Sequence, residues 1–173
     1  MRALTFWQMV TVDRSDFLKA FLEILAKEHI RFAVIGGQGV NAYAEPVVSL
    51  DLSLVVAADQ LEPLASLLEM RFRLERFPHS LNVSDPGSAL RIQIQTDPRY
   101  PAFVERAAPR EVLGVNLPVA EIRDVLQGKV WAASDASRRP SKRLKNLADI
   151  ARMLEGHPEL KALVPEEILA RLG

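Results

Sequence analysis

Residues 32–56 constrain the fold of this chain more than any other stretch, because they combine a strand, a glycine turn, a short helix and a second strand. An apolar run that begins after Arg31 is stopped by Gly36-Gly37, which predicts a buried strand followed by a tight turn. A short helix over residues 38–44 follows, before the second strand begins. We therefore expect the chain to fold around this unit, with any chemistry at its two ends.

Polar side chains lie on one face of two predicted strands. In the second strand of the unit, residues 50–57, Asp51 and Ser53 share a face opposite the apolar side chains that alternate with them. A later alternating strand places Gln93 and Gln95 on its polar face in the same way. If the two strands are neighbours in one sheet, these four side chains converge on one patch beside the glycine turn.

The glycine turn and the polar patch together predict a phosphate site. Backbone N–H groups of a glycine turn can hold phosphate oxygens, and carboxylates on an adjacent strand can hold a divalent metal. Simpler interpretations remain open at each position. Gly36 and Gly37 can serve only to permit a tight turn, Asp51 can be a turn or cap residue, and the two glutamines can be solvated. The turn is neither a P-loop nor a dinucleotide fingerprint.

The spacing of these residues resembles a known signature. Residues 35–37, Ile-Gly-Gly, are followed after the thirteen residues 38–50 by Asp-Leu-Ser-Leu at 51–54. This resembles the nucleotidyltransferase superfamily of the DNA polymerase β type, whose signature is a hydrophobic residue, Gly and Gly or Ser, then an acid–hydrophobic–acid–hydrophobic strand. The closest resemblance is to the minimal bacterial branch that includes AbiEii-like toxin proteins, because residues 38–46 and Ser49 match its register without gaps.

The resemblance implies an α/β (α+β) fold, in which a mixed sheet is flanked by helices and followed by a helical C-terminal part. It also implies a nucleoside triphosphate as ligand, with Mg²⁺ as cofactor, and it covers residues 32–154. We expect Asp51 to be the catalytic and metal-binding residue. The expected nucleotide-binding residues are Gly36, Gly37, Gln38, Ser49, Ser53, Gln93, Gln95, Lys129 and Lys142.

The acidic positions of the signature are incomplete. Ser53 stands where the second acid is expected, and Gln93 or Gln95 replaces the third, so Asp51 alone remains. Mg²⁺ needs hard anionic oxygen ligands, and the loss of two charges weakens such a site by several kcal/mol, since a contact charge pair is worth roughly 4 kcal/mol at an effective dielectric near 20. We expect weak metal binding that depends on the triphosphate. Asp85 and Asp97 are the nearest acids that could complete the site.

Basic residues are concentrated in the C-terminal part. Residues 129–145 hold six basic residues and one acid, in a chain whose 22 basic and 22 acidic residues otherwise balance. Lys129 falls on the apolar stripe of a predicted helix, so it either extends to the rim of that face or points into a cleft, where it could bind phosphate.

The next predicted helix has three cations in its first turn, Lys142, Arg143 and Lys145, where they oppose the helix dipole. This local cost favours a polyanion nearby, and residues 138–145 could bind an RNA or protein partner. A solvated basic face paired with Asp149 and Glu155 is the alternative. The apolar stripe of this helix is expected to be Leu144, Leu147, Ala151 and Leu154.

The remaining periodicity completes the predicted organisation. A core over residues 1–120 with an N-terminal helix is expected to pack against helices over 121–173 in one compact unit. The predicted helices span residues 15–29, 59–70 (capped by Asp59), 102–108, 121–134 and 140–155, followed by one or two short helices over 158–172. The further strands span 72–77, 80–83 and 90–96, and residues 111–119 are expected to form a small hairpin or two short strands around Gly114.

Several classes of protein are excluded. The chain has no cysteine, which excludes disulfide frameworks and thiolate metal sites and suits a cytoplasmic location. No segment reaches the ~20 apolar residues of a membrane helix. The apolar residues 1–10 lack a cleavage site, so they are not interpreted as a secretory signal. The three histidines are too far apart in sequence to indicate a metal site.

Three functions remain open. The first is a nucleotide-binding protein with a degenerate metal site, a pseudoenzyme in a regulatory or toxin–antitoxin-like role. The second is an active nucleotidyltransferase that transfers a nucleoside monophosphate to RNA, protein or a small molecule. The third is a protein-interaction module on the same scaffold. The two missing acids favour the first.

Overall fold

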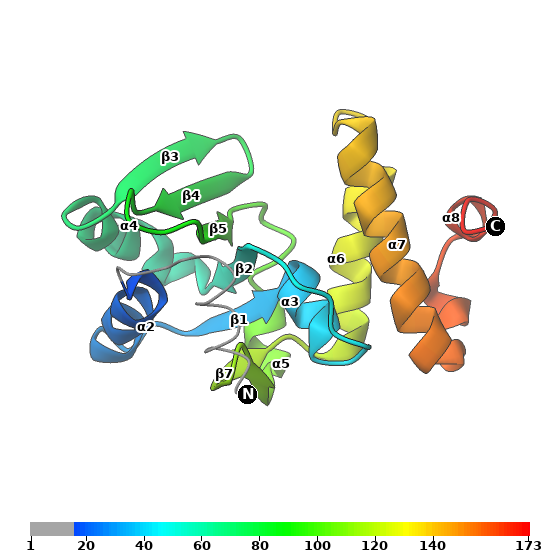
Figure 1. Cartoon of the computed structure of the whole chain (residues 1–173), viewed down its shortest axis with the longest axis horizontal. Helices are drawn as coiled ribbons and strands as arrows, with labels where there is room; N and C mark the ends of the chain where they lie inside the picture. The colour runs from blue at the N-terminus through cyan, green and yellow to red at the C-terminus, as the bar shows by residue number, and fades with distance from the viewer. Residues whose placement is uncertain (1–15) are drawn as a thin grey trace.

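The computed structural model describes residues 16–173, and within them a mixed seven-stranded sheet is flanked by helices (Figure 1). The strand order is β3-β4-β5-β2-β1-β7-β6, with β2–β5 and β1–β7 parallel and the other neighbouring pairs antiparallel. The strands are β1 (Phe32–Ile35), β2 (Asp51–Val56), β3 (Arg73–Phe77), β4 (Ser80–Ser84), β5 (Arg91–Gln95), β6 (Ala108–Val112) and β7 (Val115–Val119). This architecture confirms the predicted fold class.

The register of the central strands brings the polar residues together. β1 and β2 are antiparallel with Ile35 opposite Ser53, and β2 and β5 are parallel with Ser53 opposite Gln93. The two strands with polar faces are therefore neighbours, as the sequence predicts. Because their side chains alternate, the polar residues of both strands lie on the same face of the sheet.

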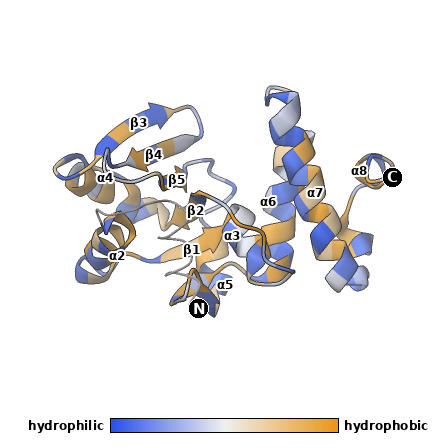
Figure 2. Cartoon of the chain, in the orientation of Figure 1, coloured by the Kyte–Doolittle hydropathy of each residue, from blue (hydrophilic) through white to orange (hydrophobic). Residues whose placement is uncertain are grey.

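Each face of the sheet has its own apolar core. On one face, α2 (Phe17–Lys27) and α4 (Leu61–Glu69) pack against alternate residues of β2, β4 and β5. The other face, which includes Val55, is covered by α3 (Gly36–Asn41), α5 (Phe103–Arg106) and the C-terminal helices. Figure 2 shows β1 as apolar along its length, as expected for a strand with both faces buried.

The C-terminal part is helical and contacts the sheet through α3. It contains α6 (Ile122–Ser134), α7 (Pro140–Gly156), the 3₁₀ segment η2 (Pro158–Leu163) and α8 (Glu166–Leu169). Figure 1 shows α6 and α7 side by side beyond the edge of α3. A Cβ on Gly39 of α3 would lie 3.3 Å from Val125 Cγ2, so this glycine permits the close approach of α3 to α6.

Some predicted boundaries are wrong. Asp59 does not cap α4: residues Ala58–Gln60 form the 3₁₀ turn η1, and Asp59 pairs with Arg31 at 3.1 Å. The hairpin around Gly114 begins earlier than predicted, because β6 starts at Ala108. Residues 1–10 lie outside the described part of the chain.

The buried stripe of α7 also differs from the prediction. Leu144 is 64% exposed, whereas Asn146, Leu147, Asp149, Ile150 and Met153 are buried. The helix is thus rotated so that Asn146 and Asp149 face α6, where both contact Lys129. Within residues 16–173, no helix is long and apolar enough to cross a membrane.

Candidate functional site

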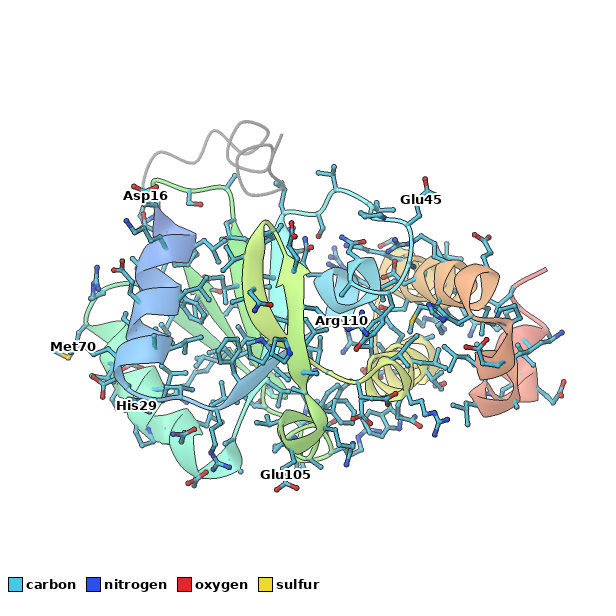
Figure 3. The ribbon with its side chains drawn as sticks, turned by 90° about the horizontal axis from the view of Figure 1, so that it is seen from below. Asp16, His29, Glu45, Met70, Glu105 and Arg110 are labelled. Carbon is cyan, nitrogen blue, oxygen red and sulfur yellow. The ribbon has the colours of Figure 1, made fainter. Side chains whose placement is uncertain are left out.

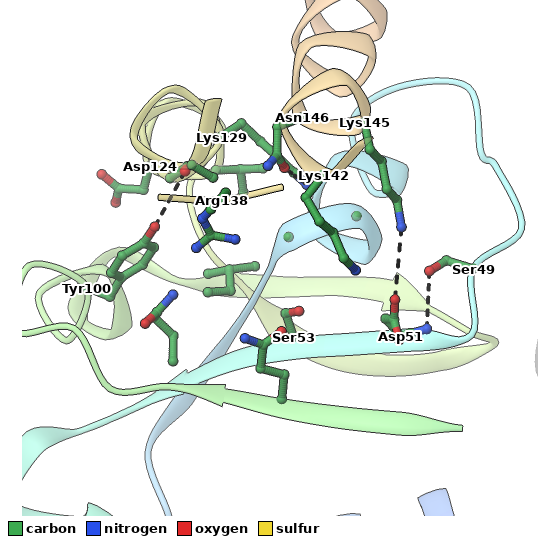
Figure 4. Close-up of a pocket in the computed structure, with 18 residues that line it drawn as sticks. Ser49, Asp51, Ser53, Tyr100, Asp124, Lys129, Arg138, Lys142, Lys145 and Asn146 are labelled. Carbon is green, nitrogen blue, oxygen red and sulfur yellow. Dashed lines mark hydrogen bonds and ion pairs between the residues drawn. The ribbon is translucent and has the colours of Figure 1, made fainter. Parts of the chain in front are cut away.

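A cavity of about 130 Å³ lies between the polar face of the sheet and the helices α6 and α7 (Figure 4). The β-strands supply its floor, the Gly36-Gly37 turn one side, and the two helices the opposite wall. Nine of the predicted site residues line it: Gly36, Gly37, Ser49, Asp51, Ser53, Gln93, Gln95, Lys129 and Lys142. They come from five separate stretches of the chain, so the fold itself brings them together.

Gln38 is the predicted site residue that does not reach this cavity. It is 3% exposed, accepts a hydrogen bond from Asn41 Nδ2 at 3.2 Å, and lines a second pocket beside residues 46–49 and the β6–β7 hairpin. The helix α3 begins at Gly36, two residues earlier than predicted. At 3.6 residues per turn, this places Gln38 on the side of α3 away from the cavity.

Gly36 and Gly37 have different structural requirements. Gly36 has φ +66°, and a Cβ there would lie 2.9 Å from Ser53 Cβ, so only glycine suits both its backbone conformation and its contact with β2. A Cβ on Gly37 would meet nothing within 4 Å. The turn interpretation therefore applies to Gly36, and Gly37 leaves space in the cavity for a ligand.

Asp51 is held between two cations. Arg91 Nε lies 2.9 Å from Asp51 Oδ1, because Arg91 is opposite Asp51 in the β2–β5 register. Lys145 Nζ, from α7, lies 3.9 Å from Asp51 Oδ2 (Figure 4). The backbone N–H of Asp51 donates to Ser49 Oγ at 3.2 Å, which fixes the start of the strand. The charge of this carboxylate is thus balanced within the protein.

The donor set does not fit a divalent metal. Among residues 16–173, no group of three or more His, Cys, Asp or Glu side chains could hold a metal ion. Ser53 and Gln93 could offer only uncharged oxygens beside Asp51, which is paired with two cations. Mg²⁺ is bound in proteins mainly through carboxylates and substrate phosphates, so this arrangement lacks the charge that the ion requires.

Neither acid considered from the sequence completes the set. Asp85 accepts a hydrogen bond from the backbone N–H of Gly87 at 2.8 Å within a turn. Asp97 pairs with Arg99 at 2.8 Å and lines a neighbouring pocket. The hydrogen bonds from Arg99 outweigh the effect of burial and hold the pKa of Asp97 below its ordinary value.

Asp124 is a cavity residue that sequence reasoning missed. It lies on α6 and is bound by Arg106, whose Nε and Nη2 donate at 2.7 and 3.1 Å. A signal was present in the sequence. Gly128 and Ala132 follow Asp124 at intervals of four, so all three share one helix face with room beside it, and all three line the cavity.

Lys129 neither extends to the rim nor stays free. Its side chain is 10% exposed, with Nζ 2.7 Å from Asp149 Oδ2 and a hydrogen bond to Asn146 Oδ1 at 3.1 Å. Arg152 also contacts Asp149, at 2.8 Å. Asp149 is therefore not part of a solvated basic face, and its pairing with Lys129 explains the rotation of α7. Burial raises the pKa of Asp149, but the charges and hydrogen bonds of Lys129 and Arg152 outweigh it and leave that pKa below its ordinary value.

The helical wall of the cavity is cationic. Four cations and two carboxylates line the cavity, and both carboxylates have cationic partners. Lys142 has no carboxylate within 4.0 Å among the described residues. Arg138 Nε lies 3.4 Å from Asp135 Oδ2 but makes no hydrogen bond. In Figure 4, Lys142 and Lys145 extend from α7 toward Ser53 and Asp51.

A polar network connects the cavity wall with the loop between α3 and β2. Arg152, which holds Asp149, donates from Nη1 to Glu45 O at 2.6 Å and to Asn41 Oδ1 at 3.2 Å. Asn41 in turn bonds both the N–H and the carbonyl of Val47. Figure 3 shows Glu45 in this loop, which leads to Ser49 at the cavity.

The chain matches no protein-family model and no curated protein sequence. Its structure resembles that of ANT(2″)-Ia in complex with adenylyl-2″-tobramycin, with a TM-score of 0.60 and 13% identity over 91% of this chain and 97% of that chain. It also resembles the lincosamide antibiotic adenylyltransferase LnuA with lincomycin bound (TM-score 0.53, 11% identity, 80% of this chain and 97% of that one).

A third similar structure is an antigenic nucleotidyltransferase-like protein from Paracoccidioides brasiliensis, with a TM-score of 0.53 and 19% identity over 91% of this chain and 88% of that chain. At these identities the likeness concerns the fold. Together with the mixed sheet and the strand–glycine turn–helix–strand unit, it leads to one conclusion: this chain has a nucleotidyltransferase-like fold.

Proposed function

We propose that this protein binds a nucleoside triphosphate by its phosphate end in the cavity, as a nucleotidyltransferase-fold protein whose acidic site is incomplete. The observation that supports this most is the combination, in one cavity, of the open Gly37 side with Lys142, which has no carboxylate partner among the described residues, and Arg138, whose Nε makes no hydrogen bond. Ammonium and guanidinium groups are the usual donors to phosphate.

The size of the cavity fits the phosphate end of such a ligand. A volume of about 130 Å³ is close to that of the engineered protein cavity of 150 Å³ that binds benzene, so one or two phosphoryl groups fill it. The nucleoside then lies outside, toward the adjoining pocket that shares Gln95, Tyr100 and Arg138 with the cavity.

A regulatory or toxin–antitoxin-like role in the cytoplasm, as in AbiEii-like proteins, belongs to the same proposal. It accounts for a nucleotide site that has lost two acids. The exposed cations of residues 138–145 are then available to an RNA or protein partner, and the exposed Leu144 lies among them.

Transfer of a nucleoside monophosphate is the second candidate, and the position of Asp124 in the cavity favours it. Asp124 and Asp51 line the same cavity, so the pair offers two carboxylates where the sequence suggested one. Both are bound by cations, however, and two-metal phosphoryl transfer needs carboxylates that are free to hold metal. Nucleotide binding therefore remains the better-supported function.

Isothermal calorimetry with ATP, GTP, CTP and UTP tests the proposal. We expect at least one triphosphate to bind, and Lys142→Gln to weaken its binding roughly tenfold, since a hydrogen bond to a charged group is worth about 1.5–3 kcal/mol. Lys161→Gln, an exposed cation outside the cavity, is the matched control and should leave binding unchanged. Failure of all four triphosphates to bind would remove the proposal.

Incubation of the protein with labelled triphosphate and total RNA separates the two candidates. We expect no label on the RNA or on the protein. Label that disappears in Asp51→Ala and in Asp124→Ala would establish transfer instead.

A further inference from the structure

Resting on the proposed nucleotide site, we propose that the cavity binds the polyphosphate without a divalent metal, with the ammonium groups of Lys142 and Lys145 supplying the positive charge. Asp51 is then a positioning residue for Lys145 rather than a metal ligand. The proposal concerns the charge of the bound species: a bare polyphosphate anion rather than its metal complex.

The carboxylate of Asp51 already contacts two cations. One carboxylate oxygen is 2.9 Å from Arg91 and the other is 3.9 Å from Lys145, so each oxygen already has a cation beside it. A metal ion at Asp51 would have to displace Lys145 and would lie beside further positive charge on α7. Like charges at such distances repel each other strongly even in a partly solvated site.

The helical wall of the cavity carries several cations. Lys129, next to them, is neutralised by Asp149 and is held in place by it. Lys142 has no acidic partner in the part of the chain that the structure describes, and Arg138, which lies 3.4 Å from Asp135, makes no hydrogen bond there through Nε. Their donors remain available to phosphate oxygens, and a metal ion would compete with them for the same oxygens.

Lys145 is placed to act together with Lys142. It follows Lys142 by three residues on α7, so the two ammonium groups lie on one face of the helix, and both line the cavity (Figure 4). Asp51 draws Lys145 down to the sheet. Two monovalent cations about one helical turn apart suit a chain of phosphates, whose negative charges are spread along its length.

Calorimetry with inorganic tripolyphosphate and with ATP, each in EDTA and in excess Mg²⁺, tests the inference. We expect both ligands to bind in EDTA and Mg²⁺ to weaken binding, because it neutralises the phosphate charge that the lysines recognise. Lys142→Gln and Lys145→Gln should each weaken tripolyphosphate binding in EDTA roughly tenfold, and Lys161→Gln should not change it.

Asp51→Asn separates the two roles of this residue. If Asp51 only positions Lys145, Asn at this position still offers Lys145 an acceptor oxygen but removes a negative charge from an anion site, so tripolyphosphate binding in EDTA becomes at least about threefold tighter. If Asp51 holds a metal, binding requires Mg²⁺ and Asp51→Asn abolishes it, which would overturn the inference. Thermal unfolding of each variant verifies that it is folded.

The result also distinguishes this inference from the function on which it rests. ATP that binds only with Mg²⁺ overturns the metal-free site and leaves the nucleotide-binding proposal in place. Tripolyphosphate that binds in EDTA, while no nucleotide binds, supports the metal-free polyphosphate site and contradicts the nucleotide-binding proposal. Absence of binding by either ligand in both conditions contradicts both proposals.

Discussion

At the scale of single residues, the cavity depends on side chains whose charges are already balanced by neighbours. Asp51 has Arg91, Asp124 has Arg106, and Lys129 has Asp149. Each of these pairs joins two separate elements, so each one shapes the site as well as neutralising it. Lys142, by contrast, has no carboxylate within 4.0 Å among the described residues.

Gly36→Ala is expected to destabilise the fold by about 2–4 kcal/mol. The substitution places a side chain at φ +66° and a Cβ 2.9 Å from Ser53 Cβ, which forces β2 away from the turn. Urea denaturation of both proteins measures the difference. Gly37→Ala is the matched control, since its Cβ would meet nothing within 4 Å, and its free energy of unfolding should change by less than about 1 kcal/mol. Equal effects of the two substitutions would contradict this explanation.

Asp97 contributes to the stability of the fold, and this contribution is lost in acid. Its pKa is lowered by Arg99, so the carboxylate stabilises the folded state above the unfolded pKa of about 3.9, and this stability is lost as the pH falls through the lower folded pKa. We expect Asp97→Asn to be less stable than the unmodified protein at pH 7 and the difference to shrink by pH 2. Denaturation curves across this range measure it. A difference that is independent of pH would show that Asp97 acts through packing alone.

At the scale of elements, the contact between α6 and α7 contains a buried ion pair where the apolar pattern predicted leucine. Lys129 and Asp149 are both nearly inaccessible, and α7 is rotated so that Leu144 faces solvent. A buried pair of this kind fixes the relative rotation of two helices, because separating the charges leaves each one unpaired in a poorly polarisable environment.

Lys129→Met is expected to cost about 3–5 kcal/mol of stability, because it leaves Asp149 buried with Arg152 as its remaining cation. The double variant Lys129→Met, Asp149→Leu should recover much of this loss, since it removes the unpaired charge. Chemical denaturation of the two single variants and the double variant gives the coupling energy. Strictly additive effects would mean that the two side chains do not act as a pair.

At the scale of the whole molecule, the central unit and its neighbours could be predicted from the sequence. Alternation placed Asp51 and Ser53 on one face of β2, and Gln93 and Gln95 on one face of β5, because the side-chain period of a strand is local information. Their meeting in one patch depended on the pairing of β2 with β5, which the structure shows. The sequence alone also showed that the acidic set is incomplete. The fold class followed from the resemblance of residues 35–54 to the nucleotidyltransferase signature.

The remaining features depend on how helices pack, which local patterns do not determine. Gln38 faces away because α3 begins two residues early, at glycines that only the fold shows to be helical. Asp124 reaches the cavity because α6 lies against α3, a contact between segments that are far apart in the sequence, and Arg138 reaches it from the connection between α6 and α7. Leu144 is exposed because an ion pair overrides the apolar stripe of its helix.

The order in which the cavity residues are synthesised has a consequence for its charge. Asp51 and Arg91 precede residue 120, whereas the four cations that line the cavity all lie between residues 129 and 145. A nascent chain that has emerged only through β7 therefore contains the strands and the glycine turn but none of these cations. The positive charge of this cavity thus appears only after residues 129–145 have been synthesised, later than the sheet that forms its floor.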